Sequence, residues 1–205
     1  HLVASDDPAF DDFTREQVKL FDKLSSEIIS SLGYPVLRHI CNTSGISRFP
    51  EAHFDLVRLG IGLYGVGASE EEQRHLLNVS SLKTTISQIK HLEPGETVGY
   101  SRRGKITTPT TLATIPIGYA DGLNRKLGNG AGHLYVHGKA APIVGSVCMD
   151  MCMIDITGIN AKEGDEVIVF DSFESLKNLA DTLGTITYEI LTSVSARVKR
   201  VYLQE

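Results

Sequence analysis

The sequence predicts an α/β segment followed by a mainly β domain. Residues 12–32 carry apolar side chains at helical spacing, and a short apolar stretch follows them. After about residue 78 the chain instead carries short apolar stretches with glycine and proline between them, which is typical of a sandwich or a barrel. A chain of 205 residues can form one large domain or two small ones, so we expect a boundary near residue 78.

The helix expected over residues 12–32 has a regular apolar face. Its members recur at steps of three to five residues: Phe13, Val18, Phe21, Leu24, Ile28 and Leu32. Thr14 and Gln17 have the spacing of a capping box. Gly33 and Pro35 predict the end of the helix.

Two short strands are expected after this helix, at residues 36–40 and 55–61. Between them, "CNTSG" predicts a polar turn, followed by a short helical or irregular piece. A strand, a helix and a strand at this spacing indicate a parallel α/β unit. Because so few elements cannot cover both faces of a parallel sheet, we expect this segment to be part of a larger unit or to pack on a partner.

The second part of the chain is expected to be built of short strands. They fall in residues 81–100, with a turn at Pro94 and Gly95, and in residues 111–119, 133–156 and 165–170. One amphipathic helix is expected from Ser172 to about Leu183, ended by Gly184, and a short helix over 187–194 leads into a closing strand over 196–204.

Composition excludes several classes of function. The formal net charge of −5 gives no electrostatic case for a nucleic-acid partner. No apolar run reaches the roughly 18 residues of a membrane helix, and no signal peptide is visible. The three cysteines, Cys41, Cys148 and Cys152, form no disulfide or zinc pattern, so we expect reduced, buried thiols in a cytoplasmic protein rather than a metal site.

Arg58 is an unusual residue in the apolar, glycine-rich stretch "FDLVRLGIGLYG". Arginine is seldom buried without a partner, and two partners are open. It could form a structural ion pair with Asp55 or Glu51, or it could hold an atom of a ligand. Gly60 and Gly62 favour the second reading modestly, because glycines let the backbone approach a bound group closely.

Other polar residues also allow two readings. Tyr100 and Tyr119 each follow a glycine and could be half-buried packing residues or functional ones, and a tyrosine acts as a base only where a cation lowers its pKa. Asp150 in "SVCMDM" could be an outward-facing residue of a strand or a buried acid. His1 and His39 are further unusual polar residues, and a lone histidine in the position of His39, at the end of a strand before "CNTSG", is more often structural than catalytic. The sequence contains no GxSxG, P-loop, HExxH or GxGxxG motif that would fix a reaction.

Taken together, several stretches resemble the bacterial alanine racemases, which are pyridoxal-phosphate (PLP) enzymes of fold type III. The matching stretches run in the order of that family: "HICNTSG", "FDLVRLGIGLYG", "TVGY", "TIPIGYADGLNR", "APIVGSVCMDMCMIDI" and "TYEILTSVSARVKRVY". The resemblance implies that residues 1–78 form the last part of a PLP-binding (β/α)8 barrel. It implies that residues 79–205 form the β-rich C-terminal domain of such an enzyme.

The resemblance also assigns cofactor-binding residues. Arg58 matches the arginine that binds the pyridine nitrogen, His1 a histidine against the cofactor ring, and His39 one bonded behind the arginine. The groups that hold the phosphate match Thr43, Gly60, Ile61 and Tyr188. Thr43 stands where the family usually has serine, which keeps the hydroxyl.

Three further residues match the catalytic and substrate-binding positions of the family. Tyr100 matches the tyrosine that acts as one of two bases, while Tyr119 and Met149 match residues of the substrate site. In the family these three side chains reach into the active site of the other subunit, so a homodimer with shared active sites is implied. No segment of this chain matches the region of the lysine that is the second base, so the chain alone is expected to be inactive.

The implied activity is the interconversion of L-alanine and D-alanine through a PLP aldimine, which supplies D-alanine for peptidoglycan in the cytoplasm. Two alternatives remain. One is a racemase of the same fold that acts on serine, lysine or many amino acids. The other is a catalytically incomplete racemase module, and fusion to another cell-wall enzyme also stays open.

Overall fold

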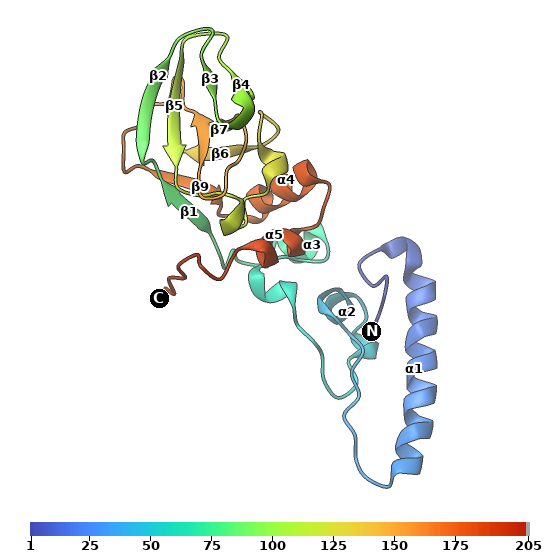
Figure 1. Ribbon diagram of the computed structural model, residues 1–205. Coiled ribbons are helices and arrows are strands. Elements are labelled where there is room, and N and C mark those ends of the chain that lie inside the picture. The colour runs from blue at the N-terminus through green and yellow to red at the C-terminus, as the bar shows by residue number, and fades with distance from the viewer. Residues whose placement is uncertain (204–205) are drawn as a thin grey trace. The chain divides into compact units, whose positions relative to one another are not determined.

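Helix α1 occupies Asp11–Leu32 in the computed structural model, which describes residues 1–203 (Figure 1). Its end is as predicted, because Gly33 takes the left-handed conformation, φ 71°, that terminates helices. Its start is not: the helix begins before Thr14, so the capping box of Thr14 and Gln17 is wrong. Gln17 instead accepts a hydrogen bond from the amide of Val3 at 3.3 Å.

The apolar face of α1 is only partly buried. Val18 and Phe21 pack against a small core that also contains Leu2, Cys41 and Phe49. The other apolar residues of the face are exposed: Phe13, Leu24, Ile28 and Leu32. The helical period was therefore predicted correctly, but it does not report which of these residues find a packing partner.

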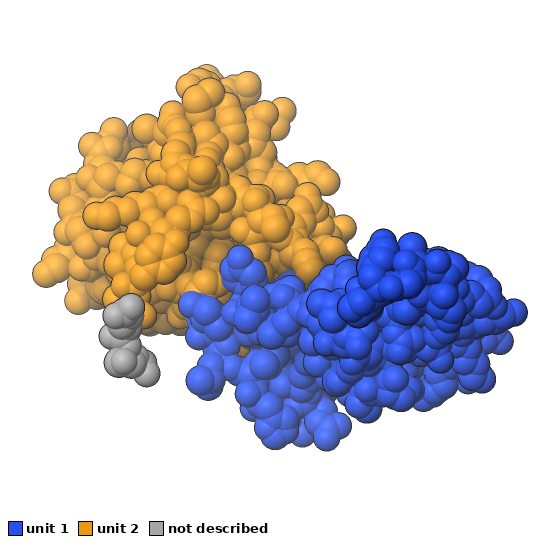
Figure 2. All heavy atoms as spheres, turned by 90° about the horizontal axis from the view of Figure 1, so that it is seen from below, with its two compact units in different colours: residues 1–79 blue, residues 80–205 orange. Residues whose placement is uncertain are grey.

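The chain forms two compact units, His1–Val79 and Ser80–Glu205, which Figure 2 colours separately. The first unit contains few regular elements besides α1. They are η1 (Pro8–Phe10), α2 (Thr43–Arg48), η2 (Pro50–Ala52), η3 (Ile61–Tyr64) and α3 (Glu70–Gln73).

The two strands expected in the first unit do not form, and this prediction is wrong. Segments 36–40 and 55–61 lie side by side with the same direction, because the amide of Asp55 donates to the carbonyl of Arg38 and that of Arg58 to the carbonyl of Cys41, both at 3.1 Å. These isolated bonds do not make a ladder. The carbonyl of Ile40 accepts from a side chain, Arg58, instead of from a neighbouring strand.

The second unit is built on a seven-stranded antiparallel sheet of order β1-β9-β6-β7-β8-β5-β2. Its strands are β1 (Leu82–Thr85), β2 (Gln88–Leu92), β5 (Thr110–Ile115), β6 (His133–Val136), β7 (Lys139–Val144), β8 (Cys152–Asp155) and β9 (Glu166–Phe170). A separate pair joins β3 (Thr97–Val98) to β4 (Gly104–Lys105). The prediction of a mainly β part is confirmed.

The two edge strands of the seven-stranded sheet are consecutive in the chain, and only two residues separate them (Figure 1). Both of these residues continue the pairing. The amide of Ile86 donates to the carbonyl of Asp165, and the amide of Ser87 donates to the carbonyl of Thr114, each at 2.9 Å. One bent segment therefore supplies both ends of the strand order and joins them, which closes the sheet into a barrel.

The core of this unit follows strand alternation, in which every second side chain points inward. Side chains with no exposed surface come from five of the strands: Ile115, Leu134, Val136, Ile143, Ile154 and Val167. Short 3-10 helices interrupt the loops: η4 (Tyr100–Arg102), η5 (Tyr119–Asp121) and η6 (Arg125–Leu127).

Two helices follow the last strand: α4 (Phe173–Leu183) and α5 (Thr187–Ser193). Both were predicted, and Ser172 caps α4 by accepting from the amide of Ser175 at 3.2 Å. The closing strand expected over 196–204 is wrong over residues 196–203, while Gln204 lies outside the described residues. There the guanidinium of Arg200 donates hydrogen bonds to the carbonyls of Val194, Ser195 and Val198. The backbone therefore turns instead of pairing with a strand.

Candidate functional site

Arg58 lies on the second of the two parallel segments of the first unit, and its side chain is exposed. Its Nη2 donates to the carbonyl of Ile40 and to Nδ1 of His1, both at 2.9 Å. Asp55, one of the two carboxylates considered as a partner, lies 3.8 Å from Arg38 instead. Within residues 1–203 the partners of this guanidinium are thus a backbone carbonyl and an imidazole, and no carboxylate pairs with it.

The contact between Arg58 and His1 fixes the state of the imidazole. A guanidinium keeps its proton and can only donate, so Nδ1 of His1 must be an acceptor. The imidazole is then neutral, with its proton on Nε2. Both N–H groups of Nη2 are in use, which leaves Nε and Nη1 of Arg58 as the donors for a further acceptor.

Thr43 begins α2 and is buried, with 2% of its surface exposed. Its Oγ1 accepts from the amides of Gly60 at 3.1 Å and Gly62 at 3.3 Å. A hydroxyl that accepts two amide bonds has its proton left to donate, and an anionic oxygen is the acceptor it suits. Gly62 allows the close approach to Thr43, because a Cβ would lie 3.0 Å from its side chain and 2.8 Å from that of Leu59, so these side chains would have to move.

Ile61 completes this small group. It is buried and is the first residue of η3, and the first amides of a helix have no acceptor within the helix. His39 is exposed two residues before Cys41, and the histidine that bonds Arg58 is His1. The structure therefore brings together His1, Thr43, Arg58, Gly60 and Ile61, and it does not join His39 to Arg58 by a hydrogen bond.

Cys41 lies beneath this group. Burial is the largest cause that raises the pKa of its thiol, the charge of Glu51 raises it further, and the charge of Arg58 opposes both. The thiol donates to the carbonyl of Ala52 at 3.2 Å. Cys41 and Cys152 are thus buried thiols as expected, whereas the same expectation is wrong for Cys148, which lies in a loop and is only partly buried.

Tyr100, in the second unit, is displayed on a strained turn. Its side chain is 74% exposed. Gly99 before it has φ 74°, and both residues after it, Ser101 with φ 57° and Arg102 with φ 52°, take the left-handed conformation. Such conformations cost a non-glycine residue about 1 to 2 kcal/mol each. Such residues cluster at active sites, ligand clamps and switch regions.

Tyr119 and Met149 lie on two backbones that are bonded to each other. The amide of Tyr119 donates to the carbonyl of Cys148, and that of Ala120 to the carbonyl of Met149, both at 3.0 Å. Gly118 makes this approach possible, because a Cβ would lie 2.3 Å from the carbonyl oxygen of Met149. Both side chains stay open to solvent, with Tyr119 42% and Met149 53% exposed.

One loop, residues 145–151 between β7 and β8, connects these three displayed side chains. It carries Met149 and accepts the bonds from the Tyr119 turn. It also lies against the Tyr100 turn, where a Cβ on Gly99 would be 3.5 Å from the amide of Ser146. The loops of Tyr100, Tyr119 and Met149 therefore pack together at one place.

Tyr188 is 46% exposed on α5. The end of α5 touches the turn that follows Tyr119, because the amide of Ser195 donates to the carbonyl of Asp121 at 3.1 Å. A Cβ on Gly122 would lie 2.6 Å from the carbonyl oxygen of Ser193, so this approach is also close. The helix of Tyr188 is thus attached to the loop of Tyr119.

Three charged residues form a bridge beside these loops. Nε of Arg197 donates to Asp121 at 2.8 Å, and Nη2 donates to Asp150 at 2.7 Å. Burial acts to raise the pKa of Asp121, but the hydrogen bonds from Arg197 and from the amide of Gly118 outweigh it and lower the pKa. The bonds to Asp121 and Asp150 raise the pKa of Arg197.

This bridge was missed by sequence reasoning. Asp150 is neither the buried acid nor the outward strand residue considered from the sequence, because it lies in a loop with its side chain 56% exposed. Asp121, three residues after Gly118, has the spacing of a turn-capping residue, and that signal was available in the sequence. Nothing local marks Arg197, since its partners are distant in the chain.

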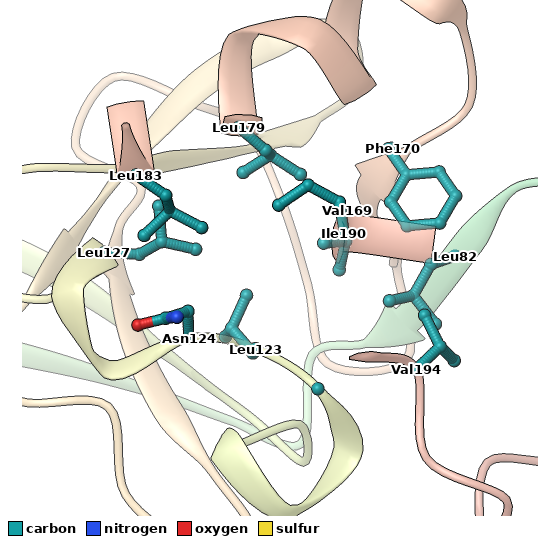
Figure 3. A pocket seen from close by; sticks show the side chains of 11 residues that line it. Leu82, Leu123, Asn124, Leu127, Val169, Phe170, Leu179, Leu183, Ile190 and Val194 are labelled. Carbon is teal, nitrogen blue, oxygen red and sulfur yellow. The ribbon is translucent and has the colours of Figure 1, made fainter. Parts of the chain in front are cut away.

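The cavity shown in Figure 3 lies in the second unit, and its lining includes Gly122 and Val194 beside the turn of Asp121. Apolar side chains such as Phe170, Leu179 and Ile190 line it, and its volume of about 20 Å³ has room for about one water molecule. It is a packing defect between β9, α4 and α5 and does not fit an amino acid or a cofactor. No group of three His, Cys, Asp or Glu residues able to hold a metal occurs in residues 1–203, and no helix in that range is long and apolar enough to cross a bilayer.

Family comparisons cover almost the whole chain. Residues 1–68 match the family described as "Alanine racemase, N-terminal domain", and residues 79–202 match "Alanine racemase, C-terminal domain". Curated relatives include Alanine racemase 1 of Clostridium acetobutylicum, 38% identical over all of this chain and 54% of that protein. Alanine racemase of Clostridium tetani is 42% identical over 82% of this chain and 46% of that protein.

Solved structures show the same fold. Alanine racemase of Clostridium difficile in complex with cycloserine superposes with a TM-score of 0.89 at 35% identity, over 99% of this chain and 55% of that one. Alanine racemase of Bartonella henselae with covalently bound pyridoxal phosphate gives 0.85 at 33% identity, over 99% of this chain and 55% of that one. The expected fold, the last part of a barrel followed by a β domain, is confirmed, and the chain spans about half the length of the relatives it matches.

Proposed function

This chain belongs to the alanine racemase family, and we propose that it is the part of an alanine racemase that binds PLP and carries the tyrosine base. The observation that carries the proposal is the set of donors around Arg58 and Thr43. The guanidinium binds a carbonyl and a neutral imidazole, and a buried hydroxyl sits on two glycine amides. These are donors without an acidic partner, which suits a ligand that offers a ring nitrogen and a phosphate.

The residues present therefore fit PLP. Arg58 would donate to the pyridine nitrogen, since Nε and Nη1 are not used by Ile40 or His1. Thr43 would donate to the phosphate, with Gly60 and Ile61 on the segment bonded to it, and His1 would lie at the ring. The resemblance adds Tyr188 as a further residue for the phosphate and His39 as the histidine behind the arginine. PLP, when bound, withdraws electrons from the α-carbon of an amino acid and so makes its proton removable.

Tyr100 would hold and move that proton on one face of the α-carbon, and the family's lysine, which has no match in this chain, would do so on the other. A base on each face explains how L-alanine and D-alanine interconvert. Tyr119 and Met149 would line the substrate site. Because all three side chains are exposed on one group of loops, we propose that they complete the site of a second subunit in a homodimer.

The test uses the full-length natural protein that contains this chain. Tyr100→Phe should slow exchange of the α-hydrogen of one enantiomer of alanine with deuterium by at least about a hundredfold, and that of the other much less. Tyr34→Phe, a change at a similarly exposed tyrosine on the first unit, is the control. Equal losses for both enantiomers would contradict the assignment of Tyr100 as one of two bases.

The alternatives have their own outcomes. Turnover across a panel of D- and L-amino acids separates an alanine racemase from one that prefers serine or lysine or accepts many substrates. A full-length protein that binds PLP but racemises none of them would be the catalytically incomplete module. The names of the relatives favour alanine, whose D-form would serve peptidoglycan synthesis in the cytoplasm.

A further inference from the structure

We infer that Arg197 is a positioning residue for the substrate site, acting through Asp121 and Asp150 on the loops of Tyr119 and Met149. The inference rests on the proposed function. Arg197 contacts neither of the two substrate-site side chains in the hydrogen bonds described above. It contacts instead the carboxylate two residues after Tyr119 and the carboxylate directly after Met149.

The first step is the geometry of the bridge. A guanidinium presents its N–H groups in a rigid fork, so one arginine can bind two carboxylates in set directions. Arg197 uses Nε for Asp121 and Nη2 for Asp150, at 2.8 and 2.7 Å. The second oxygen of Asp121 accepts from the amide of Gly118 at 2.8 Å, so the carboxylate is fixed at both of its oxygens.

The second step is what the bridge adds to the two loops. Their backbones are already joined by the bonds of Tyr119 and Ala120 to the carbonyls of Cys148 and Met149, but these bonds lie outside any strand ladder. Arg197 joins the same two loops through side chains, by its bonds to Asp121 and Asp150. It also fixes them to the segment after α5, where Ser195 donates to the carbonyl of Asp121.

The third step is electrostatic. Asp121 and Asp150 share one cation, and without it two negative charges would stand together beside Tyr119 and Met149. An amino-acid substrate brings a carboxylate to that place, and like charges repel it. Removal of Arg197 should therefore weaken substrate binding both by loosening the loops and by leaving negative charge uncompensated.

The test separates these effects in the full-length protein. Arg197→Gln should raise KM for alanine roughly tenfold with a smaller change in kcat, because the residues that bind substrate are displaced while the bases stay in place. Arg197→Lys keeps the charge but cannot span both carboxylates, so its KM should lie between the two. The same Gln change made in an Asp121→Asn, Asp150→Asn background should have a clearly smaller effect, because its partners are gone.

Arg200→Gln is the matched control, because Arg200 lies in the same segment but bonds only backbone carbonyls of residues 194, 195 and 198. A second readout does not depend on activity. The ¹³C-methyl resonance of Met149, assigned with Met149→Leu, should shift in Arg197→Gln, whereas that of Met153, which packs in a core cluster, should not.

An unchanged KM together with an unshifted Met149 resonance in Arg197→Gln would overturn the inference. So would equal effects of Arg197→Gln and Arg200→Gln. If the full-length wild type shows no racemisation at all, the proposed function fails, and the Met149 resonance still decides whether Arg197 positions the loop.

Discussion

The hydroxyl of Thr43 binds the backbone of the neighbouring glycine-rich segment. Its oxygen accepts two amide bonds while the residue itself is almost completely buried. In the full-length protein Thr43→Val should weaken PLP binding at least about tenfold, because both glycine amides lose their acceptor and the phosphate loses a donor. Thr43→Ser keeps the hydroxyl and should bind PLP within about threefold of the wild type.

A PLP titration followed by absorbance measures both Thr43 variants. Equal affinity in Thr43→Val and Thr43→Ser would show that the hydroxyl takes no part in binding.

Cys152 is a residue whose chemistry is controlled by burial. It has no exposed surface, and burial, with a smaller contribution from Cys148, raises the pKa of its thiol to about 12. At pH 8 the thiolate fraction is then about one in ten thousand, and the thiolate is the reactive form. Iodoacetamide should therefore modify the partly exposed Cys148 in the folded protein and leave Cys152 unmodified, as peptide mass spectrometry can show.

Labelling in denaturant serves as the control for this experiment, since all three cysteines should then react. Rapid labelling of Cys152 in the folded protein would mean that β8 opens readily.

The stability contributed by the bridge of Arg197, Asp121 and Asp150 depends on pH through the ionisation of Asp121. Its pKa in the folded state lies below the ordinary value of 3.8, so its contribution to stability is present above that value and is lost as the pH falls through the lowered pKa. The difference in unfolding free energy between wild type and Asp121→Asn should therefore be constant from pH 7 to about pH 5 and should shrink below about pH 4. Urea unfolding at a series of pH values measures it. A difference that grows as the pH falls below 4 would contradict the lowered pKa.

The contacts of single residues such as Arg58 show how much of the site could be predicted from the sequence. Arg58 was visible as an unusual residue, but its partners, Ile40 and His1, could not be assigned, because hydrogen bonds at that distance in the chain depend on the fold. A local rule favoured Asp55, which lies three residues away and pairs with Arg38 instead. Motif resemblance placed Thr43 beside Gly60, and the structure joins those two by a hydrogen bond, but it could not place Arg197.

At the scale of elements, the close approach of the Tyr119 turn to the Met149 loop depends on the absence of one side chain. Gly118→Ala should lower the free energy of unfolding by about 3 kcal/mol or more, because its Cβ would meet backbone oxygens of Cys148 and Met149 at 2.4 and 2.3 Å. Thermal or urea unfolding gives the value.

Gly130→Ala is the control for this change. Gly130 has φ 79° but open space around it, so alanine there should cost only the backbone strain of about 1 to 2 kcal/mol. If Gly118→Ala were no more destabilising than Gly130→Ala, the two loops would be free to separate.

Elements that are defined by local signals were predicted well, and those that depend on distant partners were not. Helix α4, the stop of α1 at Gly33 and the turn at Pro94 and Gly95 follow from caps and turn residues. The segments at 36–40 and 55–61 read as strands because they are apolar, yet a strand exists only where a neighbour completes its ladder. The same holds for residues 196–203, where the side chain of Arg200 donates to the carbonyls of Val194, Ser195 and Val198 and no partner strand is present.

At the scale of the whole molecule, the two units differ in how much of their apolar surface they bury. The second unit closes its own sheet around a core of fully buried side chains, whereas α1 in the first unit leaves Phe13, Leu24 and Ile28 exposed. Residues 80–203 expressed alone should therefore give a monodisperse protein with one cooperative thermal transition. Residues 1–79 alone should aggregate or stay unfolded.

Circular dichroism and size-exclusion chromatography of the two pieces test this difference. A second unit that melts without cooperativity would show that its closed sheet does not suffice for stability.

The bent segment of β1 and β2 has a consequence for how the protein is made. Its first half pairs with β9, so that Leu82 lies opposite Phe170, and its second half pairs with β5. During synthesis, residues 82–85 leave the ribosome about eighty residues before their partner strand β9 does. Contacts so distant in the sequence form slowly. The ring can close only when Phe170 has emerged, so until then its edges are open to neighbouring nascent chains and to chaperones.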